Sequence, residues 1–182
     1  DRVARGDPAA FRARNALQAG EELLLLLPGS RRAEIANVSP VLEDAAERLC
    51  ATRPNLLVVC VVAPSVAAQV RERAKHWRFP HRLIVDEAEK LDAFAAAAVA
   101  LAASGTVTTE AALQGAPVVV GYKIGWITWA LARAFLLRTR FITLMNVAAG
   151  REIAPEFVQT RFTAANIAAA AAPLLDNAEA RA

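Results

Sequence analysis

Five segments of the chain are predicted as β-strands because each is short, largely apolar and without the alternation of a half-exposed strand. Continuous apolar runs are typical of strands that are buried on both faces of a parallel sheet. The first run holds five consecutive leucines and ends at Pro28 and Gly29, which favour a turn. The predicted strands are residues 23–27, 55–63, 82–86, 99–103 and 116–122.

Helices are predicted between these strands. Apolar residues at steps of three and four, from Ile35 to Leu49, predict one helix. It begins either at Pro40 or after a separate turn that starts at residue 33. Further helices are predicted at residues 8–17, 64–77, 88–96, 106–114, 124–137 and 163–175, with another strand or extended segment at 141–144.

Strands that are separated by helices predict an α/β fold with a doubly wound, Rossmann-like parallel sheet. Ligands of such sheets bind outside the carboxyl ends of the strands. Polar clusters follow the predicted strand ends at Leu27, Ala103 and Leu144. We therefore expect these three clusters to lie along one edge of the sheet.

The composition predicts a single folded domain. The chain has 182 residues, of which 55% are hydrophobic, so it can bury a sizeable core. Residues 1–22 are polar and hold four arginines, and we predict that they form a linker before a domain over residues 23–182. The chain begins at Asp1 and shows no secretory signal, so a longer protein with a preceding domain is expected.

The charge and the reactive residues exclude several classes of function. The net charge is only +3 and no basic stretch alternates with aromatic residues, so a nucleic-acid partner is not expected. Cys50 and Cys60 lack metal-binding or redox spacing and are predicted as core thiols in a reducing compartment. A metal pair at His76 and His81 is the less favoured alternative, and no metal or cofactor is predicted. Neither a GxGxxG nor a P-loop motif is present.

The turn at Ser104, Gly105 and Thr106 is the first candidate binding site. It connects a predicted strand to a helix, and the first N–H groups and the dipole of a helix can hold a phosphate. The glycine would allow close approach of the backbone, and the hydroxyls add donors. Glu110, about one turn later, can accept hydrogen bonds from sugar hydroxyls. An ordinary capped helix is the alternative interpretation.

Gly29, Ser30 and Arg31 form the second candidate, directly after the first predicted strand. A guanidinium group recognises phosphate with two parallel hydrogen bonds. A surface arginine after a turn is the alternative interpretation.

Asn146, Glu156 and Gln159 form the third candidate. Asn146 can donate and accept hydrogen bonds at once, as recognition of a ribose, base or phosphate requires. Glu156 and Gln159 are three residues apart and are expected on one face of a helix. Ordinary capping and surface polarity are the alternative.

Residues 126–137 are apolar on nearly all sides and include Trp126, Trp129, Arg133 and Phe135. The segment is too short to span a bilayer, which needs about 20 apolar residues. Tryptophan next to basic residues suits an interfacial helix on anionic lipid, so peripheral membrane contact is predicted. A helix buried between domains or in a homodimer is the alternative.

Several short motifs, each weak alone, together resemble the lipid-A-disaccharide synthases (glycosyltransferase family 19) over residues 23–175. Val107 and the pair at 147–148 are mild variants of the family pattern. In order, the motifs are LPGSR at 27–31 with EI at 34–35 and a proline at 40, ASGT at 103–106 with TE at 109–110, VGYK at 120–123, LMN at 144–146 with AG at 149–150, and PE at 155–156 with a glutamine at 159.

The resemblance implies a GT-B glycosyltransferase, in which two Rossmann-like domains face each other across a cleft. This chain would be the carboxyl-terminal domain that binds the UDP-sugar donor. The implied reaction is an inverting, metal-independent transfer from UDP-2,3-diacylglucosamine to the lipid acceptor 2,3-diacylglucosamine 1-phosphate, which yields lipid A disaccharide 1-phosphate and UDP. The catalytic base and much of the acceptor site would belong to the amino-terminal domain. The implied location is cytoplasmic, on the inner face of the bacterial inner membrane.

Within this resemblance, Arg31 and the turn at 104–106 would hold the diphosphate, and Glu110 the ribose. Asn146, Glu156 and Gln159 would complete the donor site. Two alternatives stay open. One is another GT-B domain, such as a UDP-GlcNAc transferase of peptidoglycan synthesis or a UDP-sugar epimerase. The other is a non-catalytic nucleotide-binding module, which the clustering of polar groups on one predicted edge argues against.

Overall fold

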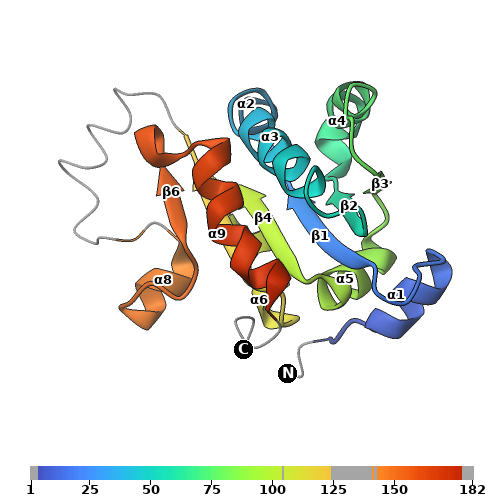
Figure 1. Ribbon diagram of the computed structural model, residues 1–182. Helices are drawn as coiled ribbons and strands as arrows, with labels where there is room; N and C mark the ends of the chain where they lie inside the picture. The colour runs from blue at the N-terminus through green and yellow to red at the C-terminus, as the bar shows by residue number, and fades with distance from the viewer. Residues whose placement is uncertain (1–3, 104, 124–140, 142, 178–182) are drawn as a thin grey trace.

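The structure, a computed structural model, describes residues 4–103, 105–123, 141 and 143–177. The described residues form a six-stranded, all-parallel sheet in the order β3-β2-β1-β4-β5-β6 (Figure 1). This confirms the predicted doubly wound α/β fold. The strands are β1 (Glu22–Leu27), β2 (Leu56–Val61), β3 (His81–Ile84), β4 (Val99–Ala103), β5 (Val118–Tyr122) and β6 (Glu156–Val158).

The apolar strands are continuous runs because each of them packs on both faces. In β1, Leu24 and Leu26 belong to one hydrophobic core, while Leu23, Leu25 and Leu27 belong to the other. All five leucines are at most 1% exposed. A strand in this position has no wet face, so polar alternation is absent.

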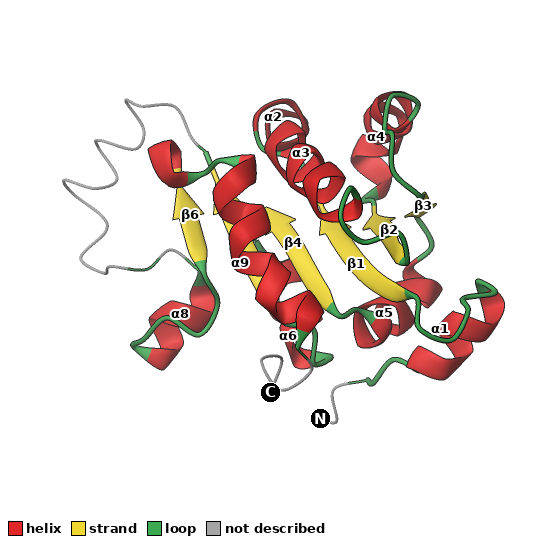
Figure 2. Cartoon of the chain, in the orientation of Figure 1, coloured by secondary structure: helices red, strands yellow, loops and turns green. Residues whose placement is uncertain are grey.

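Helices cover both faces of the sheet (Figure 2). Residues of α3, α4 and α9 pack into one core, and residues of α1, α5 and α6 pack into the other. The helices are α1 (Pro8–Arg14), α2 (Arg32–Asn37), α3 (Ser39–Cys50), α4 (Ala67–Ala74), α5 (Glu87–Ala96), α6 (Thr106–Leu113), α8 (Leu144–Ala149) and α9 (Ala164–Asp176), with single 3-10 turns η1 (Pro64–Val66) and η3 (Gln159–Arg161).

The predicted helix after the first strand consists of two helices. α2 ends at Asn37 and α3 begins at Ser39, with Val38 between them. Pro40 lies in the first turn of α3, where its missing N–H costs no intrahelical hydrogen bond. Both alternatives for the start of this helix are therefore present in part, because α3 begins next to Pro40 and the separate turn before it is the short helix α2.

Two predictions near the carboxyl end are wrong. Leu144 begins helix α8 and does not end a strand, because the Thr143 side chain caps that helix by accepting a hydrogen bond from the backbone N–H of Asn146. Glu156 lies in the edge strand β6, so Glu156 and Gln159 do not share a helix face. The strand pairs with β5, from Val120 with Glu156 to Tyr122 with Val158.

The amino-terminal segment packs onto the domain. Helix α1 lies against α5, and the Phe11 side chain is fully buried in the core. Asp7 caps α1 and donates its backbone N–H to the Asp92 carboxylate of α5. Residues 8–14 are therefore part of the folded unit, while a domain before residue 1 stays a prediction.

Two sets of predicted residues lie outside the described part of the chain. They are Ser104 and the segment that holds Trp126, Trp129, Arg133 and Phe135. Among the helices that the structure does describe, none is both long enough and apolar enough to cross a membrane.

Candidate functional site

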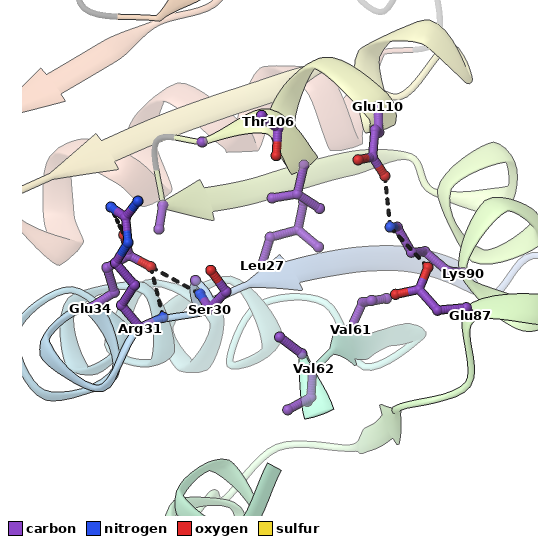
Figure 3. A pocket seen from close by; sticks show the side chains of 15 residues that line it. Leu27, Ser30, Arg31, Glu34, Val61, Val62, Glu87, Lys90, Thr106 and Glu110 are labelled. Carbon is purple, nitrogen blue, oxygen red and sulfur yellow. Dashed lines mark hydrogen bonds and ion pairs between the residues drawn. The ribbon is translucent and has the colours of Figure 1, made fainter. Parts of the chain in front are cut away.

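A cavity of ≈ 420 Å³ opens at the carboxyl ends of β1, β2 and β4. Strands β1 and β4 are neighbours, but β1 leads to β2 on one side of the sheet and β4 leads to β5 on the other. The strand order therefore reverses here, which is where open α/β sheets bind ligands. Two of the predicted clusters meet at this cavity: Gly29, Ser30 and Arg31 after β1, and Gly105, Thr106 and Glu110 after β4 (Figure 3).

The loop after β1 is held in place by Glu34 of α2, a residue that was not predicted to belong to the site. The Glu34 carboxylate accepts hydrogen bonds from the backbone N–H groups of Ser30 (2.9 Å) and Arg31 (3.1 Å). Ser65, after β2, donates its hydroxyl to the carbonyl of Ser30 at 3.0 Å. The loop thus offers a ligand the Arg31 side chain, whereas these two backbone amides are already engaged.

Gly29 is required by the same arrangement. Its φ of +104° lies in the left-handed region, which side chains rarely adopt. A Cβ atom there would lie 2.4 Å from Glu34 Oε2. The sequence signal for Glu34 was its position three residues after Arg31, where an acidic residue in the first helical turn can accept backbone hydrogen bonds.

Arg31 is the most exposed cation of the cavity. Its side chain is 77% exposed, and its Nη1 atom lies 3.5 Å from Glu34 Oε1. An exposed ion pair of this length contributes little stability, so the guanidinium can reach a ligand at low cost.

The turn after β4 presents the amino terminus of α6 to the cavity. Gly105 caps this helix with an extended backbone and an open space where a Cβ would lie, so the structure does not require a glycine here. Thr108 turns its hydroxyl back to the Gly105 carbonyl. Thr106 and Glu110, four residues apart on α6, both line the cavity, which places a helix terminus and a carboxylate on one wall.

Lys90 and Glu87 of α5 are further cavity residues that sequence reasoning missed. Lys90 Nζ lies 2.7 Å from Glu110 Oε2 and 3.1 Å from Glu87 Oε2 (Figure 3). Burial lowers the pKa of Lys90, but the hydrogen bonds with Glu110 and Glu87 outweigh it, and the net pKa lies above its usual value. Nothing in the sequence distinguishes this lysine from those of a solvated helix face.

Asn146 of α8 and Glu156, the first residue of β6, lie together at the amino-terminal end of that strand. Figure 1 shows α8 at this end of β6. Fully buried Asn146 donates to the carbonyl of Ala154 and to Glu156 Oε1, both at 2.7 Å, and accepts from the backbone N–H groups of Ile153 and Ala154. Thr143 also donates to Glu156 Oε1, through its backbone N–H and its hydroxyl. The expectation of one shared edge is therefore wrong for Asn146.

Gln159 follows β6 directly and lies at the carboxyl edge of the sheet. Its side chain is buried, and its φ of +54° is unusual for a residue other than glycine. β6 is two strands away from β4, about 10 Å at ordinary strand spacing. Gln159, Asn146 and Glu156 are not among the residues that line the cavity. A contact of any of the three with a ligand stays a prediction.

The two histidines show no metal site in the described part of the chain, where no cluster of three or more His, Cys, Asp or Glu residues is placed to hold an ion. The His81 ring packs edge-on against Trp77, and its Nδ1 atom lies 2.9 Å from the carbonyl of Phe79. These contacts give His81 a packing role.

Solved structures with the same fold include glycosyltransferases and UDP-N-acetylglucosamine 2-epimerases. The carboxyl-terminal domain of a group 1 glycosyl transferase (LpcC) from Francisella tularensis aligns with a TM-score of 0.60 at 13% identity, over 96% of this chain and 85% of that one. WaaG, a glycosyltransferase involved in lipopolysaccharide biosynthesis, aligns with a TM-score of 0.59 at 16% identity, over 94% of this chain and 42% of that one. The fold is thus a Rossmann-like domain of the GT-B type.

Sequence comparison identifies the family. Residues 1–182 match the family model of LpxB, the lipid-A-disaccharide synthetase. Curated lipid-A-disaccharide synthases from Granulibacter bethesdensis and Rhodospirillum centenum are 40% and 39% identical over 96% and 97% of this chain. The chain belongs to the lipid-A-disaccharide synthase family, as its motifs predicted. It spans 44% of the length of each of these two relatives.

Proposed function

We propose that this chain is the donor-binding domain of a lipid-A-disaccharide synthase, which transfers diacylglucosamine from UDP-2,3-diacylglucosamine to 2,3-diacylglucosamine 1-phosphate. The observation that carries the proposal is the cavity between the carboxyl ends of β1 and β4 in a chain of this family. Its lining joins a cation, a helix terminus and a carboxylate, the groups that a nucleoside diphosphate requires.

In this proposal, Arg31 and the amino terminus of α6 hold the diphosphate of the donor. When the glycosidic bond to the donor breaks, negative charge develops on UDP as it leaves. Donors already in place stabilise that charge without reorganisation. The engaged amides of Ser30 and Arg31 support a role for the guanidinium in this loop, since the loop backbone is occupied by Glu34.

The ribose hydroxyls donate to the Glu110 carboxylate in the proposed complex. The Glu110 side chain is 42% exposed at the cavity, so a ligand can reach it. The transfer is proposed to invert the anomeric centre without a metal ion, with the base and most of the acceptor site in an amino-terminal domain. The chain alone is then expected to bind UDP and not to turn over.

Calorimetric titration of the chain with UDP tests this proposal. UDP is expected to bind equally with and without EDTA, while NAD gives no heat. Arg31→Met is expected to weaken the affinity for UDP about 10- to 100-fold, because hydrogen bonds to a charged group are lost. The matched control is Arg48→Met, which removes an exposed arginine on α3, away from the cavity. Equal losses in both variants, or metal-dependent UDP binding, contradict the proposal.

A chimera tests the reaction. The amino-terminal half of the Granulibacter bethesdensis relative is placed before this chain, and disaccharide formation is measured with diacylated substrates. Turnover with these substrates and none with UDP-GlcNAc supports the synthase over the other UDP-sugar enzymes. Arg31→Met and Glu110→Ala are expected to reduce turnover. If turnover survives both changes, the chain is a nucleotide-binding module without a catalytic role.

We further propose peripheral membrane contact through the segment with Trp126 and Trp129, on the sequence pattern alone. The substrates carry acyl chains, so the enzyme must reach them at the cytoplasmic surface of the inner membrane. Replacing both tryptophans by serine is expected to reduce co-sedimentation with anionic vesicles. Unchanged co-sedimentation together with loss of a dimer in sedimentation analysis would assign the segment to a subunit interface.

A further inference from the structure

Lys90 joins two helices at the wall of the cavity. It projects from α5, and its ammonium group reaches Glu110 on the neighbouring α6, while Glu87 approaches from the preceding turn of α5 (Figure 3). The Lys90 side chain is only 16% exposed, in contrast to 42% for Glu110 and 73% for Glu87. A cation that is largely withdrawn from water between two carboxylates is fixed in place, because each displacement would leave charge without a partner.

The groups around Lys90 fix the orientation of its side chain. Its Nζ atom lies 5.9 Å from the centre of the Phe94 ring, one turn further along α5, so the ring closes one side of the ammonium. The two carboxylates occupy the other sides. Lys90 contacts Glu110 and Glu87 through the Oε2 atom of each carboxylate. Lys90 therefore holds the Glu110 carboxylate by one oxygen at the wall of the cavity.

We propose that Lys90 is a positioning residue that holds Glu110 for the ribose and thereby sets the preference of the site for a nucleotide with an intact 2′,3′-diol. The inference rests on the proposed donor function and adds a residue and a specificity to it. Without Lys90, Glu110 repels Glu87 and gains rotamer freedom, and each of these changes weakens a hydrogen bond from a sugar hydroxyl.

A direct contact of Lys90 with the diphosphate is the competing role. The charges argue against it, because Lys90 is already matched by two carboxylates, whereas Arg31 is 77% exposed with one carboxylate at 3.5 Å. The geometry of α6 agrees, since Thr106 at its start and Glu110 one turn later are separated by about 6 Å along the helix axis. In a nucleotide, the ribose likewise separates the 5′-phosphate from the 2′ and 3′ hydroxyls, so the phosphate can lie at the start of α6 while the hydroxyls lie near Glu110.

The test compares the dissociation constants of UDP and 2′-deoxy-UDP for the full chain and its variants by calorimetry. The unchanged chain is expected to prefer UDP about tenfold, the typical value of a hydrogen bond to a charged group. Lys90→Met keeps the length of the side chain and is expected to reduce this preference to within about twofold. Lys90→Arg is expected to restore it. The matched control is Lys75→Met, because Lys75 forms an exposed pair with Glu72 on α4.

A double variant separates positioning from general destabilisation. In a Glu110→Gln background, Lys90→Met is expected to cause no further loss of preference, because its effect passes through Glu110. Thermal unfolding of each variant confirms that it is folded. The ratio of the two dissociation constants is insensitive to a fraction of unfolded protein, since both ligands lose the same binding sites.

The outcomes are distinct. If Lys90→Met weakens both nucleotides equally and keeps their ratio, Lys90 contacts another part of the ligand and the proposal is wrong. If the unchanged chain binds UDP without preferring it over the deoxy compound, the proposal is wrong while the donor function stands. If the folded chain binds neither nucleotide, the donor function and the role of Lys90 fail together.

Discussion

Asn146→Ala is expected to destabilise the fold and to leave the affinity for UDP nearly unchanged. The side chain is fully buried and satisfies the backbone N–H and carbonyl of Ala154, a residue that is itself only 4% exposed. It also binds Glu156 and the N–H of Ile153, which lie closer to solvent. Alanine at position 146 would therefore leave two buried backbone groups without their partner.

The magnitude follows from these two groups. Each buried polar group that loses its partner costs about 1–3 kcal/mol, so the free energy of unfolding should fall by roughly 3 kcal/mol. For a chain of this size, each kcal/mol corresponds to about 2–4 °C in the melting temperature. A decrease of roughly 6–12 °C is expected.

The assay is differential scanning calorimetry of the Asn146→Ala variant, followed by titration with UDP at a temperature where both proteins are folded. Asn37→Ala is the matched control, because Asn37 is exposed on α2 and its amide caps only a helix carbonyl. The donor role that the motif suggested for Asn146 predicts the reverse pattern. An unchanged melting temperature together with a tenfold or greater loss of UDP affinity would refute the structural argument.

Three further changes test the fold and its chemistry. Gly29→Ala is expected to lower the free energy of unfolding, measured by urea denaturation, by more than about 1 kcal/mol. The positive φ alone costs about that much, and the new Cβ would also displace Glu34. An unchanged urea midpoint would mean that the loop relaxes freely. Phe11→Ala is expected to cost about 3 kcal/mol in the same assay, whereas a mere linker would lose nothing. Burial raises the pKa of Cys50 to about 11 and that of Cys60 further, so neither thiol should react with a disulfide reagent at pH 8 before unfolding. Because these pKa values are raised in the folded state, the free energy of unfolding should keep its full value below about pH 9 and fall as the pH rises toward 11. Urea titrations at pH 8 and 10.5 can measure this decrease.

The site illustrates which interactions leave a local signal. Gly29 and Arg31 were predicted because a strand that ends in a turn is visible over a few residues. Glu34 belongs to one of the family motifs but was not predicted as a site residue, since its role depends on how the loop folds back over it. Lys90 carried no signal, because its partner Glu110 is 20 residues away on another helix.

Five of the six described strands, their burial on both faces and the loops that follow β1 and β4 could be predicted from the sequence. Those features depend on the order of apolar residues within short segments, which local burial and turn preferences dictate. Edge strand β6 escaped prediction because three residues carry too few positions for a period, and its pairing with β5 is a distant contact. Three features became visible only in the folded chain: α1 packs on the core, Asn146 binds the backbone of Ala154, and Lys90 pairs with Glu110. These contacts could not be predicted because the crossover connections bring together residues that are far apart in the chain, and no local pattern records such pairings.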